Sequence, residues 1–123
     1  EPGENGGRIV LLVENDIELR NAMSQTLERM GVSVIEAENG EAALDLLDEL
    51  GIAPDVCLID YQLGEGMSGV DLIQLLFARH GALPARVITA NRAPQIRAAV
   101  RDAGLEIMWK PVTPEALASF VLA

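Results

Sequence analysis

The sequence predicts an α/β fold in which helices cover both faces of a parallel, five-stranded sheet. Short apolar runs rich in β-branched residues alternate five times with stretches of helical periodicity. Each run is separated from the next by enough residues for the helical crossover that parallel strands require. At 123 residues the chain has the size of one domain with its own hydrophobic core. We therefore expect a single three-layer domain.

Each predicted strand is a short apolar run bounded by turn-forming residues. The strands are expected over residues 9–13, 32–35, 55–59, 86–89 and 106–109. The first helix begins near Asp16, whose side chain suits an N-cap, and Gly31 ends it. Its buried face is predicted from apolar residues three or four positions apart, namely Leu19, Met23, Leu27 and Met30.

Glycine or proline marks the ends of the other four predicted helices, because these residues interrupt or start helices for steric reasons. The helices are expected between Gly40 and Gly51, between Gly69 and Gly81, over residues 94–103, and from the Thr113-Pro114 pair onward. Alternating strands and helices of these lengths imply right-handed crossovers and helices on both faces of the sheet.

Composition excludes several classes of function. The chain has 19 acidic and 9 basic residues, a formal net charge of −10, which opposes direct binding of a phosphate backbone, so no nucleic acid partner is expected. The longest apolar run, residues 9–13, is far shorter than the roughly 20 residues that cross a bilayer, so no membrane contact is expected. The single Cys57 lies within an apolar run and is expected in the core.

The first residues have neither the positive flank nor the apolar centre of a secretory signal. Residues 1–7 are rich in glycine and are interpreted as a flexible leader or the remnant of a linker. The domain is expected to span residues 8–123, in a cytoplasmic protein.

Polar side chains end four of the predicted strands. Glu14 follows the first strand, Asp60 the third, Thr89 the fourth and Lys110 the fifth. The carboxyl ends of parallel strands share one edge of the sheet, where open α/β sheets place their ligand sites. In the flavodoxin-like strand order 2-1-3-4-5, the first strand lies beside the third and brings Glu14 close to Asp60. Such a set of groups suits phosphoryl transfer to an aspartate.

Four short motifs occur in a characteristic order: Leu12-Val13-Glu14-Asn15-Asp16, Leu58-Ile59-Asp60-Tyr61-Gln62-Leu63, Ile88-Thr89-Ala90 and Lys110-Pro111. Together they resemble the receiver domain of two-component signalling, which is found in response regulators and in hybrid histidine kinases. The resemblance covers the chain from about Arg8 to its end. It implies a flavodoxin-like (CheY-like) three-layer sandwich with five parallel strands in the order 2-1-3-4-5 and five helices.

The resemblance also implies a role for each matched residue. Asp60 would be the phosphoacceptor that attacks a phosphohistidine on a histidine kinase or a histidine phosphotransfer domain. Thr89 and Lys110 would contact phosphoryl oxygens, and the Lys110-Pro111 bond would be cis. The domain itself would catalyse only its own phosphorylation and dephosphorylation.

A magnesium ion is expected to neutralise charge at this site, because it prefers oxygen ligands and keeps several waters. By resemblance, its ligands would be the carboxylate of Asp60, the backbone carbonyl of Gln62, and the side chains of Glu14 and Asn15. The second acidic position of this cluster is commonly an aspartate, and here it is the neutral Asn15. We therefore expect weaker magnesium binding, unless the chain turns early enough for Asp16 to compensate.

Two further departures concern signalling. The family often has an aromatic side chain at the position occupied here by Ile107, so a switch would have to act through another element, such as the helix over residues 94–103. The loop of residues 64–69 is glycine-rich and one residue longer than usual. This form resembles the receivers at the carboxyl end of hybrid histidine kinases, which makes such a kinase the expected parent protein.

Other functions stay open at this stage. A phosphatase of the haloacid dehalogenase type also uses aspartate, a hydroxyl, lysine and magnesium, but its nucleophile follows the first strand, with a second aspartate two residues later. Position 62 is a glutamine. A pseudo-receiver that only binds partners is compatible with Asn15 and Ile107. A stand-alone response regulator is a further alternative, and a homodimer is left open.

Overall fold

A computed structural model describes residues 8–123, so the predicted leader over residues 1–7 lies outside the described residues. Five parallel strands form one sheet in the order β2-β1-β3-β4-β5. They are β1 (Ile9–Val13), β2 (Ser33–Ala37), β3 (Val56–Asp60), β4 (Ala85–Thr89) and β5 (Glu106–Trp109). The predicted strand order is confirmed.

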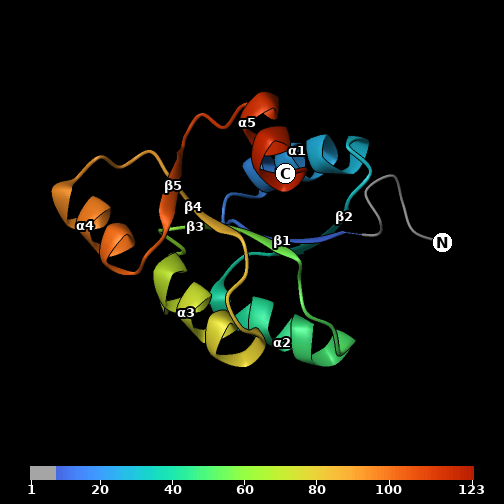
Figure 1. Ribbon diagram of the computed structural model, residues 1–123, viewed down its shortest axis with the longest axis horizontal. Coiled ribbons are helices and arrows are strands. Elements are labelled where there is room, and N and C mark those ends of the chain that lie inside the picture. The colour runs from blue at the N-terminus through green and yellow to red at the C-terminus, as the bar shows by residue number, and fades with distance from the viewer. Residues whose placement is uncertain (1–7) are drawn as a thin grey trace.

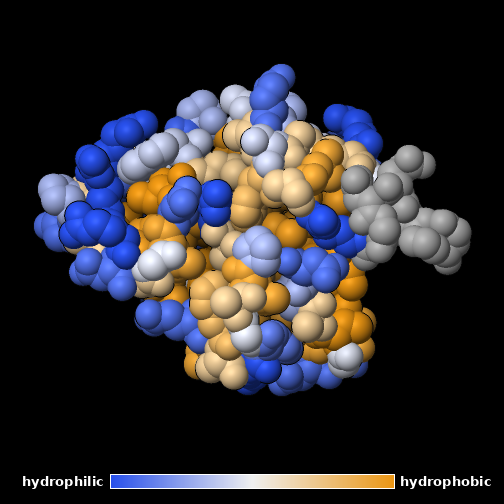
Figure 2. Space-filling view, in the orientation of Figure 1, coloured by the Kyte–Doolittle hydropathy of each residue, from blue (hydrophilic) through white to orange (hydrophobic). Residues whose placement is uncertain are grey.

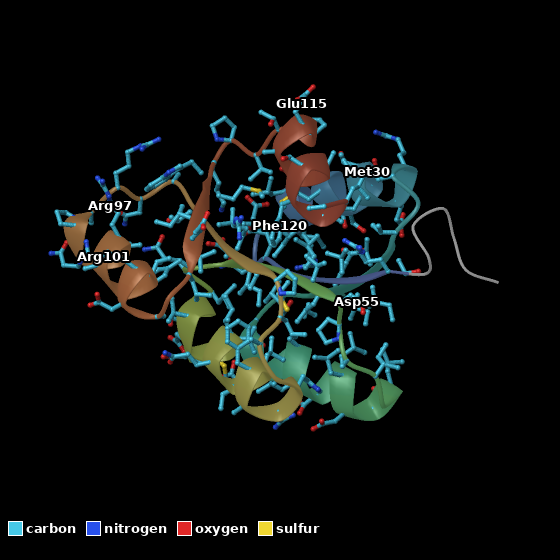
Figure 3. The ribbon with its side chains drawn as sticks, viewed as in Figure 1. Met30, Asp55, Arg97, Arg101, Glu115 and Phe120 are labelled. Carbon is cyan, nitrogen blue, oxygen red and sulfur yellow. The ribbon has the colours of Figure 1, made fainter. Side chains whose placement is uncertain are left out.

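Five helices connect and cover these strands: α1 (Ile17–Arg29), α2 (Gly40–Leu50), α3 (Gly69–His80), α4 (Pro94–Asp102) and α5 (Pro114–Val121). Figure 1 shows α1 and α5 on one face of the sheet, with α2 and α3 on the other and α4 at one end. The surface over α4 is mainly hydrophilic (Figure 2), and its Arg97 and Arg101 extend outward (Figure 3). None of the described helices is long and apolar enough to cross a membrane.

A separate apolar core lies on each face of the sheet. Leu11, Cys57 and Val87 belong to the core beneath α2, α3 and α4, whereas Leu12 and Leu58 belong to the core beneath α1 and α5. Because side chains alternate along a strand, β3, which is buried throughout, and β1, which is buried from Val10 onward, supply both cores. The two central strands are therefore held from both sides, which fixes the position of the residues at their carboxyl ends.

The first and last helices begin with the side-chain caps that the sequence predicts. Asp16 Oδ1 accepts hydrogen bonds from the backbone N–H groups of Glu18 and Leu19. Thr113 Oγ1 accepts a hydrogen bond from the N–H of Ala116. These bonds satisfy N–H groups that have no partner within the helix.

Three strands extend beyond their predicted bounds, and one of them, β4, begins at Ala85 instead of residue 86. β2 begins at Ser33 and runs to Ala37, because Ala37 still pairs with Val13 of β1. β3 includes Asp60, which pairs with Ile88 of β4 rather than lying beyond the strand. The backbone of Asp60 is therefore part of the sheet.

Candidate functional site

A cavity of about 880 Å³ opens at the carboxyl ends of β1, β3, β4 and β5. The six residues that the sequence proposes for the site all line it: Glu14, Asn15, Asp60, Gln62, Thr89 and Lys110. The strand order explains this convergence, because β1 pairs with β3, and β3 with β4, which in turn pairs with β5.

Lys110 lies between two carboxylates in this cavity. Its Nζ donates a hydrogen bond to Asp60 Oδ2 at 3.1 Å and lies 3.2 Å from Glu14 Oε1. Partial burial alone would lower the pKa of Lys110, but the hydrogen bond to Asp60 and the two negative charges outweigh it and raise the pKa. The ammonium group is therefore charged at neutral pH. The peptide bond between Lys110 and Pro111 is cis, as the resemblance implied.

Glu14 is almost completely buried, with an exposed fraction of 1%. Its Oε2 accepts a hydrogen bond from the N–H of Asp16 at 3.0 Å. Its Oε1 is buried and accepts no hydrogen bond from the described residues, although Lys110 Nζ is close. Burial and the nearby Asp60 raise the pKa of Glu14. Burial of the Glu14 carboxylate costs solvation free energy, and a bound cation would offset part of this cost.

Asp60 is also buried, and its two carboxylate oxygens have different partners. Oδ1 accepts a hydrogen bond from the N–H of Gln62 at 3.1 Å, while Oδ2 accepts the one from Lys110. The buried side chain of Leu63 anchors the chain that follows. The backbone turn after Asp60 therefore holds both the carboxylate and the Gln62 peptide at the cavity.

Thr89 ends β4 with a buried side chain that lines the same cavity. Its Oγ1 accepts a hydrogen bond from the N–H of Asn91 at 3.0 Å. A hydroxyl that accepts through a lone pair keeps its own O–H for donation. Thr89 can thus donate a hydrogen bond to an anion in the cavity.

The oxygen groups at the cavity fit a hard divalent cation. Carboxylates, an amide oxygen and a backbone carbonyl are ligands that magnesium and calcium prefer, and the buried Glu14 Oε1 has only its ion pair with Lys110 and accepts no hydrogen bond from the described residues. Among residues 8–123, no group of three or more His, Cys, Asp and Glu side chains is placed to hold a metal. A cation here would thus need the neutral oxygens of Asn15 and Gln62, together with water.

Asp16, which the sequence offers as compensation for Asn15, has a capping role in the structure. Asp16 lies at the cavity, but its Oδ1 caps α1 through two backbone N–H groups. Oδ1 is therefore engaged in the cap. Asn15 is exposed and lines the cavity.

As the sequence indicates, β5 carries Ile107 at the position where the family often has an aromatic side chain. Ile107 is half-buried and packs against the core beneath α4. Trp109 pairs with Thr89 across the sheet, and the guanidinium of Arg92 lies 4.1 Å from the centre of its ring. This stacking was not predicted, because Arg92 comes from the separate loop between β4 and α4.

The sequence did not predict two residues that contact the backbone of the site residues. Arg20 Nη1 donates a hydrogen bond to the backbone carbonyl of Glu14 at 2.7 Å. Gly69, at the start of α3, lies so close to Asp60 that a Cβ at residue 69 would overlap the Asp60 carbonyl oxygen. No sequence pattern indicates either contact, because each one is made to a backbone carbonyl that belongs to a different part of the fold.

Comparison with known protein families shows to which family this chain belongs. The model of the response regulator receiver domain matches residues 10–122. The chain belongs to the response regulator receiver family. Receiver domains typically use a divalent metal for phosphorylation and work with a cognate histidine kinase, in agreement with the oxygen-rich cavity.

This receiver domain is similar to parts of larger proteins. It is 38% identical over 109 residues to a cyclic di-GMP phosphodiesterase of Thermotoga maritima, covering 88% of this chain and 28% of that protein. It is 26% identical to the peroxide stress-activated histidine kinase mak3 of Schizosaccharomyces pombe, covering 95% of this chain and 5% of the kinase. The chain thus spans a small part of these relatives.

A solved structure shows the same fold. The N-terminal domain of a response regulator/sensory box/GGDEF three-domain protein from Carboxydothermus hydrogenoformans is 30% identical, with a TM-score of 0.78. The similarity covers 93% of this receiver domain and 90% of that chain.

Proposed function

We propose that this receiver domain accepts a phosphoryl group on Asp60 from the phosphohistidine of a histidine kinase or a histidine phosphotransfer domain. One observation carries the proposal. The buried Asp60 carboxylate shares the ammonium of Lys110 with Glu14 in a cavity that Thr89 also lines. A nucleophile, a fixed cation and a hydroxyl donor therefore face one space.

The proposed step is a displacement at phosphorus. An Asp60 carboxylate oxygen attacks the phosphorus atom, and the bond between phosphorus and the imidazole nitrogen of the donor breaks. The imidazole nitrogen takes the electron pair and then a proton. Lys110 is placed to neutralise charge on the transferred phosphoryl oxygens, and Thr89 to donate a hydrogen bond to one of them.

Glu14, Asn15, Asp60 and the carbonyl of Gln62 are the residues that would hold Mg²⁺, which supplies further neutralisation of phosphoryl charge when bound. Because Asn15 contributes no charge, Mg²⁺ binds this domain more weakly than it binds a site with two acidic residues in the cluster. We expect half-maximal phosphorylation at a correspondingly higher Mg²⁺ concentration.

The proposal is tested by incubating the domain with phosphoramidate, a small phosphodonor, at several Mg²⁺ concentrations and measuring its intact mass. Wild type should gain the mass of one phosphoryl group in a metal-dependent reaction. The Asp60→Asn variant should gain none, since an amide is not a nucleophile for this step.

Two other results would point to the competing functions. The absence of an adduct in wild type at every Mg²⁺ concentration would favour a pseudo-receiver that only binds partners. Repeated release of phosphate from an ester substrate, without an accumulating adduct, would favour a phosphatase.

We also propose that the parent protein is a hybrid histidine kinase. The glycine-rich loop over residues 64–69 supports this placement, as does the likeness to the mak3 histidine kinase. The likeness to a cyclic di-GMP phosphodiesterase supports a stand-alone or differently fused regulator instead. The full-length gene product separates these alternatives: a kinase core in the same polypeptide is the expected result.

A further inference from the structure

Arg20 contacts the backbone of the acidic turn after β1. Its Nη1 donates a hydrogen bond to the backbone carbonyl of Glu14 at 2.7 Å. The side chain is largely buried, with an exposed fraction of 14%. Its backbone N–H bonds to the carbonyl of Asp16 in the first turn of α1. The short, charge-assisted contact therefore ties the start of α1 to the residue that precedes Asn15.

Glu36 forms an ion pair with the guanidinium, and Ser24 holds Glu36 in place. Arg20 Nε lies 3.4 Å from Glu36 Oε1, and Glu36 Oε2 accepts a hydrogen bond from Ser24 Oγ at 2.9 Å. Glu36 belongs to β2 and Ser24 to α1, so the arginine is held between a strand and its own helix. A planar guanidinium can contact the carbonyl and the carboxylate at once, whereas a lysine ammonium offers a single point of charge.

The contact constrains Glu14 and Asn15 together. The N–H of Glu14 donates to the carbonyl of Ala37 at 3.1 Å, and its own carbonyl accepts from Arg20, so both of its peptide groups are fixed. The peptide bond is planar, and fixing the Glu14 carbonyl therefore also fixes the nitrogen and Cα of Asn15. The directions in which both side chains enter the cavity thus depend on Arg20.

We propose that Arg20 is a positioning residue for the divalent metal site, with Glu36 and Ser24 holding it in place. This inference rests on the proposed function. The acidic cluster, Glu14-Asn15, has one charge fewer than a cluster with two acidic residues, and Arg20 fixes the backbone that directs both of its side chains. Residues that orient metal ligands from behind typically change affinity by about 10- to 100-fold when they are replaced.

The test compares Arg20→Lys with wild type in two measurements. Titration with Mn²⁺, followed by electron paramagnetic resonance, reports cation binding to the unphosphorylated domain. The rate of phosphorylation by phosphoramidate is then measured as a function of Mg²⁺ concentration. We expect Mn²⁺ to bind roughly tenfold more weakly. The Mg²⁺ concentration for half-maximal rate should rise by a similar factor, while the maximal rate stays close to that of wild type.

Two further variants separate positioning from general damage. Arg79→Lys is the matched control, because Arg79 also forms an ion pair, with Asp48, on the far side of the fold between α3 and α2. It should leave both measurements unchanged. Glu36→Gln removes the charge that orients Arg20 and should shift Mn²⁺ binding in the same direction by a smaller factor. If Arg20→Lys fails to fold by circular dichroism, Glu36→Gln decides the question.

Unchanged Mn²⁺ affinity in Arg20→Lys would overturn the inference, as would a lower maximal rate with an unchanged half-saturating Mg²⁺ concentration. The proposed function fails separately, if wild type is not phosphorylated at any Mg²⁺ concentration. The comparison of Mn²⁺ affinities still decides the role of Arg20 in that case.

Discussion

Gly69 lies directly against the main chain of Asp60. The N–H of Gly69 donates to the carbonyl of Tyr61 at 2.9 Å, and a Cβ at residue 69 would overlap the Asp60 carbonyl oxygen. The first turn of α3 thus approaches the backbone of the proposed phosphoacceptor more closely than any other residue type allows. The position of Asp60 depends on this close approach.

Replacing Gly69 with alanine should therefore disturb the site as well as the fold. Overpacking against a backbone group that cannot move freely lowers stability, and we expect the free energy of unfolding in urea to fall by about 2 kcal/mol. Phosphorylation by phosphoramidate should slow, because Asp60 itself must shift.

Gly40→Ala is the matched control for this prediction. Gly40 is also a buried first residue of a helix, but its added Cβ would meet the flexible side chain of Met67 instead of a backbone group. Its stability and phosphorylation should fall less than those of Gly69→Ala, because a side chain can move aside more easily than a backbone carbonyl. Equal losses in the two variants would contradict a specific role for the contact with Asp60.

Lys110→Met should leave two facing carboxylates without their fixed cation. Loss of the hydrogen bond to Asp60 and of the charge beside Glu14 should lower the free energy of unfolding by about 2 kcal/mol at neutral pH. The pKa of Glu14, already raised by burial, should rise further. A raised pKa in the folded state means that stability is lost as pH rises through it, so the deficit should grow with pH.

Urea unfolding at several pH values, with and without Mg²⁺, measures this effect. Mg²⁺ should restore part of the lost stability, because a cation that binds only the folded state stabilises it. If the variant is as stable as wild type at every pH in the absence of metal, the ion pairs of Lys110 with Asp60 and Glu14 do not contribute to stability.

The thiol of Cys57 should be inert in the folded protein. Burial raises its pKa to about 12, so the reactive thiolate is scarce at pH 8. Ellman's reagent should modify the thiol slowly in native protein and rapidly in urea. Fast modification of the native protein would mean that β3 opens readily around Cys57.

The sequence was sufficient to predict the sheet and the convergence at its edge. Hydrophobic runs and turn residues place the strands, and parallel pairing then brings Glu14, Asp60, Thr89 and Lys110 to one cavity. The strand order 2-1-3-4-5 came from the flavodoxin-like fold that the resemblance implies, since the alternation of strands and helices restricts the crossovers without selecting one order.

Contacts between a side chain and a distant backbone group could not be predicted in this way. The hydrogen bond from Arg20 to the Glu14 carbonyl depends on the orientation of α1 relative to β1. The close approach of Gly69 to Asp60 depends on how α3 packs against β3. The role of Asp16 was open for a related reason, since a carboxylate at a helix start suits either a cap or a ligand. In the structure, Asp16 Oδ1 caps α1.

The central claim is that the phosphoryl group forms a covalent bond with the side chain of Asp60. Borohydride reduces an aspartyl phosphate to homoserine, so peptide mapping by mass spectrometry after phosphorylation and reduction locates the modified residue. We predict homoserine at position 60, only in samples that received both phosphodonor and Mg²⁺. Homoserine at another acidic residue, or at none while the intact protein carries a phosphoryl group, would contradict the account.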